Sequence, residues 1–149
     1  MRIAIAADHA GYALKETLKT LFDAVDWLDL GTNSEVSVNY PDYGFAMGEA
    51  ITAGRAVRGV VICGSGIGIS IAANRFPAVR AALCTNATMA RLSRQHNDAN
   101  VLALGSRIIG VEVAQECLHT FLHTAFDGGR HQQRTDLLQV NVLEKLDSC

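Results

Sequence analysis

Short apolar runs alternate with amphipathic stretches along the whole chain. An apolar run of about four to eight residues is typical of a strand buried on both faces, whereas apolar positions three and four residues apart indicate a helix. On this basis we predict strands at Ile3–Ala7, Val25–Leu30, Gly59–Cys63, Ala78–Cys84 and Val101–Leu104. We predict helices at Gly11–Phe22, Tyr43–Ala53, Thr88–His96, Val111–Phe121 and Leu137–Leu146.

Strands that alternate with helices predict an α/β fold with a parallel sheet and helices on both of its faces. The sequence contains no Pro/Ser-rich linker, low-complexity tract or internal repeat, so we expect one domain over residues 1–149. Ligands of such open sheets bind beyond the carboxyl ends of the strands. Three candidate segments follow predicted strands: Asp8-His9, Cys63–Gly68 and Gly105–Arg107.

Composition narrows the class of protein. The chain has 149 residues, 49% of them hydrophobic and 19% charged, and its net charge is −2. This balance is that of a soluble globular protein and argues against nucleic-acid binding, which calls for a strongly basic face. No apolar run has the roughly 20 residues that cross a bilayer, and the apolar N-terminal run is too short for a signal peptide. We therefore expect a cytoplasmic protein that binds neither nucleic acid nor membrane.

The four cysteines are scattered and include no CxxC pair, which predicts reduced thiols and no structural zinc site. One of them, Cys63, begins the run Cys63-Gly64-Ser65-Gly66-Ile67-Gly68 after a predicted strand. Glycines at alternate positions let backbone N–H groups face a cleft, where they stabilise negative charge. A thiolate beside such a turn could act as a base or a nucleophile. The alternatives are a tight strand-to-helix turn and a small buried hydrophobic residue.

Three further polar clusters are candidates for chemistry. In Arg94–Asn100, His96 could exchange a proton near neutral pH and Asn97 could bond an oxyanion, although a helix C-cap explains the same run. If Gly128–Arg134 is helical, Arg130 and Arg134 share a face that suits a phosphate; a solvated basic stripe is the alternative. Asp8 and His9 could face the cleft or cap the following helix.

Taken together, these segments closely resemble ribose-5-phosphate isomerase B. The resemblance covers nearly the whole chain and rests on residues 8–15, 63–75, 93–98, 105–107 and 128–134, in that order. The wider family includes isomerases of allose 6-phosphate and galactose 6-phosphate. It implies a three-layer, Rossmann-like α/β/α fold with a five-stranded parallel sheet. It also implies a homodimer, or a dimer of dimers, with active sites built from both subunits. We expect the C-terminal helix to pack on the dimer partner.

The resemblance also implies roles for individual residues. Cys63 matches the base that moves a proton between C1 and C2 of the open sugar; Ile69 stands where some relatives place a glutamate instead. Ser65 matches a residue that assists transfer between the two oxygens, and His96, with Asp8, matches the acid that opens the ring. The remaining matches are substrate and phosphate contacts: His9, Gly64, Gly66, Ile67, Gly68, Asn97, Arg107, Arg130 and Arg134.

We therefore expect a cofactor-free and metal-free aldose–ketose isomerase that interconverts ribose 5-phosphate and ribulose 5-phosphate through an enediolate. An isomerase of allose 6-phosphate or galactose 6-phosphate is the alternative within the same chemistry. A sugar-phosphate-binding module without catalysis is a rival from another class, but simple binding would not require Cys63, Ser65 and His96 together. A nicotinamide oxidoreductase is a weaker rival, because the glycine-rich turn follows the third predicted strand instead of the first.

Overall fold

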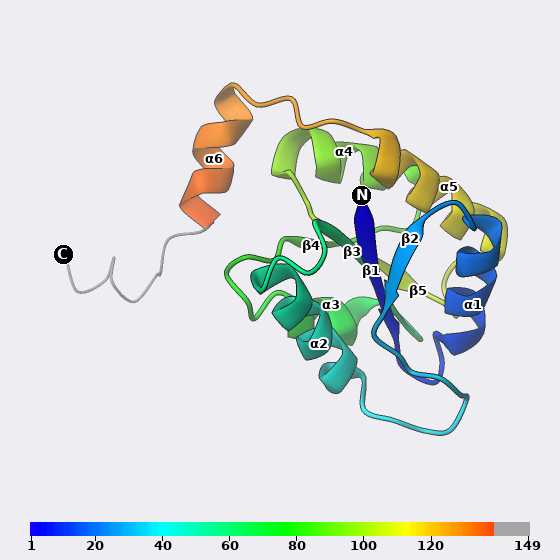
Figure 1. Ribbon diagram of the computed structural model, residues 1–149. Coiled ribbons are helices and arrows are strands. Elements are labelled where there is room, and N and C mark those ends of the chain that lie inside the picture. Colours follow the sequence, from blue (N-terminus) through cyan, green and yellow to red (C-terminus); the bar gives the residue numbers. More distant parts are fainter. Residues whose placement is uncertain (139–149) are drawn as a thin grey trace.

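The computed structural model, described here for residues 1–138, is a three-layer α/β/α fold around a five-stranded parallel sheet (Figure 1). The strands lie in the order β2-β1-β3-β5-β4. In chain order the elements are β1 (Arg2–Ala7), α1 (Tyr12–Leu21), β2 (Asp26–Asp29), α2 (Tyr40–Thr52), β3 (Arg58–Cys63), α3 (Ile67–Ala73), β4 (Ala81–Leu83), α4 (Ala87–Asn97), β5 (Val101–Gly105), α5 (Val111–His123) and α6 (Arg130–Leu138). The predicted fold class is confirmed.

Apart from Arg2 and Arg58 at their starts, the three central strands are apolar and buried, because helices cover both faces of the sheet. On one face, Ile5, Ile62 and Leu104 pack in a core shared with α1, α4 and α5. On the other face, Val61 and Ala103 belong to a second core shared with α2 and α3. A period of two along each strand therefore divides its side chains between two cores.

Close packing at the carboxyl ends of the strands depends on glycine at two positions. A Cβ atom on Gly11 would lie 2.5 Å from the carbonyl oxygen of Ile62, so α1 can begin this close to β3 only with glycine there. Gly66, just before α3, has a φ of +78°, in the left-handed region that favours glycine. A Cβ atom on Gly66 would also lie 2.8 Å from the carbonyl carbon of Leu104.

Three predicted elements have an end that differs from the structure by three residues or more. Helix α2 begins at Tyr40 instead of Tyr43, because Pro41 fits the first turn of a helix, where no N–H donor is needed. Strand β4 is shorter than the predicted Ala78–Cys84. The N–H of Arg80, just before it, bonds the side chain of Asn100 (2.8 Å) instead of a neighbouring strand. The last predicted helix overlaps α6 only at residues 137 and 138, and its remainder lies outside the described residues.

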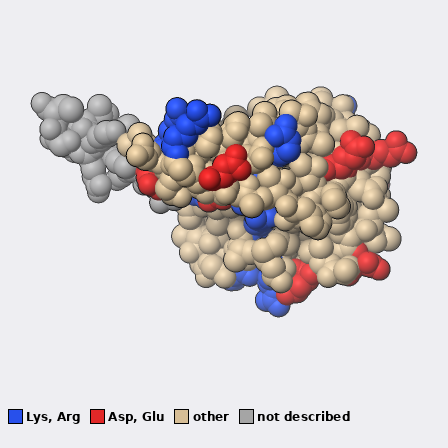
Figure 2. Space-filling model, turned by 90° about the horizontal axis from the view of Figure 1, so that it is seen from above, with Lys and Arg blue, Asp and Glu red and all other residues tan. Residues whose placement is uncertain are grey.

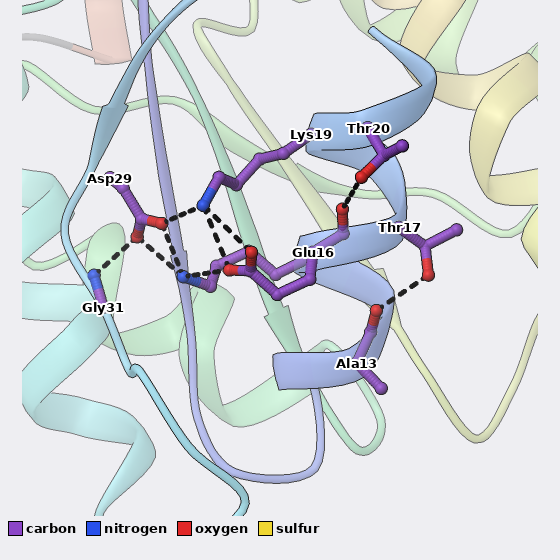
Figure 3. Close-up of polar contacts among 8 residues, drawn as sticks. Ala13, Glu16, Thr17, Lys19, Thr20, Asp29 and Gly31 are labelled. Carbon is purple, nitrogen blue, oxygen red and sulfur yellow. Dashed lines mark hydrogen bonds and ion pairs between the residues drawn. The ribbon is translucent and has the colours of Figure 1, made fainter. Parts of the chain in front are cut away.

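A cluster of four charged residues joins α1 to β2 (Figure 3). The ammonium group of Lys15 lies 2.7 Å from Asp29 and 3.0 Å from Glu16, and its side chain is completely buried. Lys19 bonds the second Asp29 oxygen, and Asp29 also accepts the N–H of Gly31 (2.9 Å). The Gly31 carbonyl in turn accepts the N–H of Ala7, the last residue of β1. The cluster therefore fixes the segment that leads into Asp8.

The expectation of no membrane span agrees with the helices of residues 1–138. None of them is both long enough and apolar enough to cross a bilayer.

Candidate active site

A groove lies at the carboxyl ends of the strands, where the sequence places its first candidates. It encloses about 500 Å³. Its lining brings together residues that follow β1, β3 and β5, together with the start of α2: Asp8, Tyr40, Cys63, Gly64, Ser65, Ile67, Gly68, Arg107 and Ile108. Seven of these nine residues are predicted site residues, and the topology of a parallel sheet is what gathers them at one edge.

Cys63 is the last residue of β3, and only 4% of its surface is exposed. Its Sγ accepts the backbone N–H of Gly66 at 3.1 Å. Cys63 also lines the groove. The sulfur therefore lies at the wall of the groove, beside the glycine turn, as the proposed role of a base requires.

The amides of the glycine turn are directed toward its own side chains. The N–H of Gly66 bonds Cys63, and the N–H of Ile67 bonds Oγ of Ser65 at 3.2 Å. The turn thus presents donors to a thiolate or to another anion in that place. We predicted amides that face a cleft; in this structure two of them, those of Gly66 and Ile67, bond Cys63 and Ser65.

Asp8 and His9 each make a structural hydrogen bond. A carboxylate oxygen of Asp8 accepts the N–H of Gly11 at 3.0 Å, which ties the turn before α1. Nδ1 of His9 accepts the N–H of Val38 at 3.2 Å and so holds the loop before α2. Asp8 also lines the groove, whereas His9 is not among the described residues that line it. The alternative that Asp8 or His9 caps α1 is wrong, because Gly11 is the N-cap and no side chain makes a cap hydrogen bond there.

Arg107 lies over the glycine turn because the segment after β5 is bonded to the end of β3. The N–H of Ser106 bonds the carbonyl of Cys63 (2.9 Å), and the N–H of Arg107 bonds that of Gly64 (3.0 Å). The guanidinium would lie 3.3 Å from a Cβ atom on Gly64, so any larger residue at Gly64 would crowd it. This arrangement places a positive charge at the groove.

Sequence analysis missed Tyr40 as a groove residue. A Cβ atom on Gly68 would lie 2.6 Å from the Tyr40 ring, so the ring packs directly on the glycine turn. The signal in the sequence is weak, because Tyr40 belongs to a polar loop in the pattern of residues. Only the fold brings the start of α2 beside α3.

Four other predicted site residues, His96, Asn97, Arg130 and Arg134, lie at the end of the strands opposite the groove. Helix α4 ends at Asn97, just before β5 begins, so His96 and Asn97 lie near the amino ends of the strands. Arg130 and Arg134 are on α6, which is helical as the arginine spacing requires and lies near α4, far from the end of β1 (Figure 1). Within one chain the structure therefore forms two groups of predicted residues instead of one site.

Part of the polar run 94–100 has a structural role, as its C-cap alternative predicts. Asp98 caps α4 in the left-handed conformation (φ 45°). Its carboxylate pairs with Arg94 and Arg80, each at 2.8 Å. His96 is different: its ring stacks on that of His131 with centroids 4.4 Å apart. Desolvation and the nearby His96, Arg130 and Arg134 hold the pKa of His131 below its ordinary value.

Figure 2 shows the molecule from above relative to Figure 1: the surface is mostly uncharged, and basic and acidic side chains are interspersed across it. Asn97 lines a cavity together with Arg80 and Leu138.

Comparison with known proteins gives a consistent result. The model of the Ribose/Galactose Isomerase family matches residues 3–138. The chain is 44% identical over 139 residues to ribose-5-phosphate isomerase B of Escherichia coli, which covers 92% of this chain and 93% of that one. It is 43% identical over 137 residues to a putative sugar phosphate isomerase of Bacillus subtilis, covering 90% and 92% of the two chains.

Solved structures extend this similarity to the fold. Ribose-5-phosphate isomerase B of Clostridium thermocellum matches with a TM-score of 0.93 and 47% identity over 97% of this chain and 98% of that one. The enzyme of Thermotoga maritima matches with a TM-score of 0.90 and 48% identity over 93% and 97%. With sequence, family model and fold in agreement, this chain belongs to the ribose/galactose isomerase family.

Proposed function

We propose that this protein interconverts ribose 5-phosphate and ribulose 5-phosphate, with Cys63 as the base. The observation that carries the proposal is the position of the Cys63 sulfur: it lines the groove and lies 3.1 Å from a backbone N–H of the glycine turn. A base and an anion-stabilising donor thus stand side by side, which is what removal of a proton next to a carbonyl needs. Relatives named ribose-5-phosphate isomerase B support the choice of substrate.

In the proposed reaction the Cys63 thiolate takes the proton from C2 of the open aldose. The electron pair of the C–H bond forms the C1–C2 double bond, and O1 becomes the enediolate oxygen. A proton then passes from O2 to O1, with Ser65 assisting. The Cys63 thiol returns its proton to C1, and a carbonyl remains at C2. No electrons are exchanged with another molecule, so the step balances without a redox cofactor.

The glycine turn would stabilise the charge of the enediolate. Once the Cys63 thiolate has taken the proton, its sulfur is neutral. The Gly66 N–H, which bonds this sulfur in the structure, can then bond an oxygen of the intermediate. The Ile67 N–H, which bonds Ser65 in this structure, lies on the same turn and is a second candidate donor. In other enzymes the removal of one such donor costs about 3–4 kcal/mol of transition-state stabilisation.

A second copy of the chain would complete the site. His96, Asn97, Arg130 and Arg134 lie at the other end of the strands, so they can reach a Cys63 groove only in a neighbouring subunit. Beside the groove, Ile67, Ile71 and Ile108 are more than half exposed, which suits an apolar subunit interface. In the dimer, His96 would open the sugar ring, Asn97 would bond an oxyanion, and the arginines would hold the phosphate. Contacts to the non-reacting phosphate would position the sugar.

We also infer a cytoplasmic location. Cys63, Cys84 and Cys117 are free and buried, as is usual for proteins of a reducing compartment. Burial raises the pKa of Cys84 to about 12 and that of Cys117 to about 11. Both are therefore neutral thiols at pH 7, unlike the thiolate that the mechanism asks of Cys63.

A panel of sugar phosphates tests the substrate. We expect the highest kcat/KM with ribose 5-phosphate, a lower value with allose 6-phosphate and galactose 6-phosphate, and very little turnover of unphosphorylated ribose. The last expectation follows because Arg130 and Arg134 would have no phosphate to bind. A coupled assay that follows ketose formation gives all four values. A higher kcat/KM with a hexose phosphate would contradict the proposed substrate and favour the hexose alternative.

A heterodimer of two inactive chains tests the shared site. Cys63→Ala and His96→Ala chains with different affinity tags would be co-expressed, and the mixed dimer purified through both tags. If His96 acts in the partner's site, one of the two sites is intact, and a two-fold dimer should retain about half of the wild-type activity. If Cys63 and His96 act within one chain, both sites are defective and the mixed dimer is inactive.

A further inference from the structure

A carboxylate and two imidazoles meet at the junction of α4 and α6. One ligand atom from each of His96, Asp127 and His131 lies within 4.8 Å of the other two. The two rings are nearly parallel, at 6°, with centroids 4.4 Å apart. Around tetrahedral zinc, with bonds of about 2.0–2.1 Å, ligand atoms are about 3.3 Å apart. Because an imidazole nitrogen binds a metal ion in the plane of its ring, both stacked rings, as well as the exposed Asp127, would turn toward a common point to bind one ion.

The backbone already holds the three segments together. The N–H of Asp127 bonds the carbonyl of Gln95, next to His96, at 3.1 Å. The N–H of His131 bonds the carbonyl of Gly128 at 3.0 Å. The end of α4 is itself fixed by the Asp98 cap and its two arginines. Most of the ordering that a metal site requires is therefore made by the fold before an ion arrives.

The donor set selects the kind of ion. Two imidazole nitrogens and one carboxylate oxygen suit Zn²⁺ and its neighbours Co²⁺ and Ni²⁺, which leave further positions for water. Mg²⁺ and Ca²⁺ prefer oxygen ligands alone. The charges of Arg130 and Arg134 oppose a cation here and that of Asp127 favours it, so the two nitrogen bonds must provide most of the affinity.

We propose that His96, Asp127 and His131 form an inhibitory site for Zn²⁺ or a similar divalent transition-metal ion. The ion would occupy a ring nitrogen of His96 and prevent that imidazole from donating a proton. This inhibition rests on the proposed function: without a proton from His96, the sugar ring would not open. Arg130 and Arg134 do not ligate the ion, so the phosphate can still bind; the ion should therefore lower kcat more than it raises KM.

Titration with Co²⁺, which stands in for Zn²⁺ and gives visible absorption when bound by ring nitrogens, tests the site directly. We expect saturable binding of one ion per chain. His131→Gln and Asp127→Asn each remove a ligand and should weaken binding by roughly a hundredfold or more, since loss of even an outer-shell partner costs about 10- to 100-fold. His123→Gln is the matched control, because His119 and His123 also stack, at 4.3 Å, on the exposed side of α5.

The results separate the possible outcomes. Binding that is lost in His131→Gln and Asp127→Asn but kept in His123→Gln supports the site. No binding by the wild-type protein, unchanged affinity in His131→Gln, or loss only in His123→Gln overturns it. Turnover of ribose 5-phosphate is measured separately with Zn²⁺ and then with a chelator. If the metal-saturated protein keeps full activity, the inhibitory role fails, and so does the role of His96 in ring opening. Absence of activity without metal contradicts the proposed function and leaves the binding result to stand alone.

Discussion

Replacement of Cys63 by alanine should reduce turnover of ribose 5-phosphate by about 10²- to 10⁴-fold, the usual contribution of a general base. The fold should survive, because the change removes a single sulfur atom at the end of β3. Steady-state kinetics gives the first result, and thermal unfolding followed by circular dichroism gives the second. The variant should still bind the substrate phosphate, so the loss should appear in kcat.

Cys84→Ala and Cys117→Ala are the matched controls. Both cysteines are buried free thiols with raised pKa values and lie away from the groove. We expect them to lose some stability and keep their activity. Turnover of Cys63→Ala within about tenfold of wild type would fall short of the contribution of a general base, and would remove Cys63 from that role.

Replacement of Asp29 by alanine should destabilise the protein by about 2 kcal/mol at pH 7. This is less than the roughly 3–5 kcal/mol lost with one partner of a fully buried ion pair, because the Asp29 side chain is 26% exposed. Lys15 would keep its charge in a completely buried position with only Glu16, 3.0 Å away, as an acidic partner. The Gly31 N–H would also lose its acceptor. Urea unfolding at equilibrium measures the difference. Asp26→Ala is the control on the same strand: its pair with Arg2 is more than half exposed on both sides and should contribute less than about 1 kcal/mol.

The stability that Asp29 contributes should decrease as the pH falls. Desolvation by itself would raise the pKa of Asp29, but hydrogen bonds from Lys15, Lys19 and Gly31 outweigh it, and the pKa lies below the ordinary 3.8. The stabilisation is therefore complete above pH 3.8 and is lost as the pH falls through the lower pKa of the folded state. The difference between wild type and Asp29→Ala should shrink in acid. A difference in unfolding free energy that stays constant down to pH 2, about two pH units below the ordinary carboxyl pKa, would contradict this role of the ion pair.

The pattern of residues along the chain was enough to predict the fold class and most residues of the groove at the carboxyl ends of the strands. Alternating apolar runs require a parallel sheet covered on both faces, and the carboxyl ends of parallel strands meet at one edge. Asp8, Cys63 and Arg107 therefore come together in the structure as their places after predicted strands imply.

The positions of the other site residues depend on tertiary contacts and could not be predicted from the sequence pattern. Their sequence pattern gives His96, Arg130 and Arg134 a suitable chemistry, but it does not say at which end of the strands they lie. Tyr40 reaches the groove, Asp98 becomes a structural cap, and His96 stacks on His131 for the same reason. Each position depends on contacts between segments far apart in the chain, and local periodicity contains no information about such contacts.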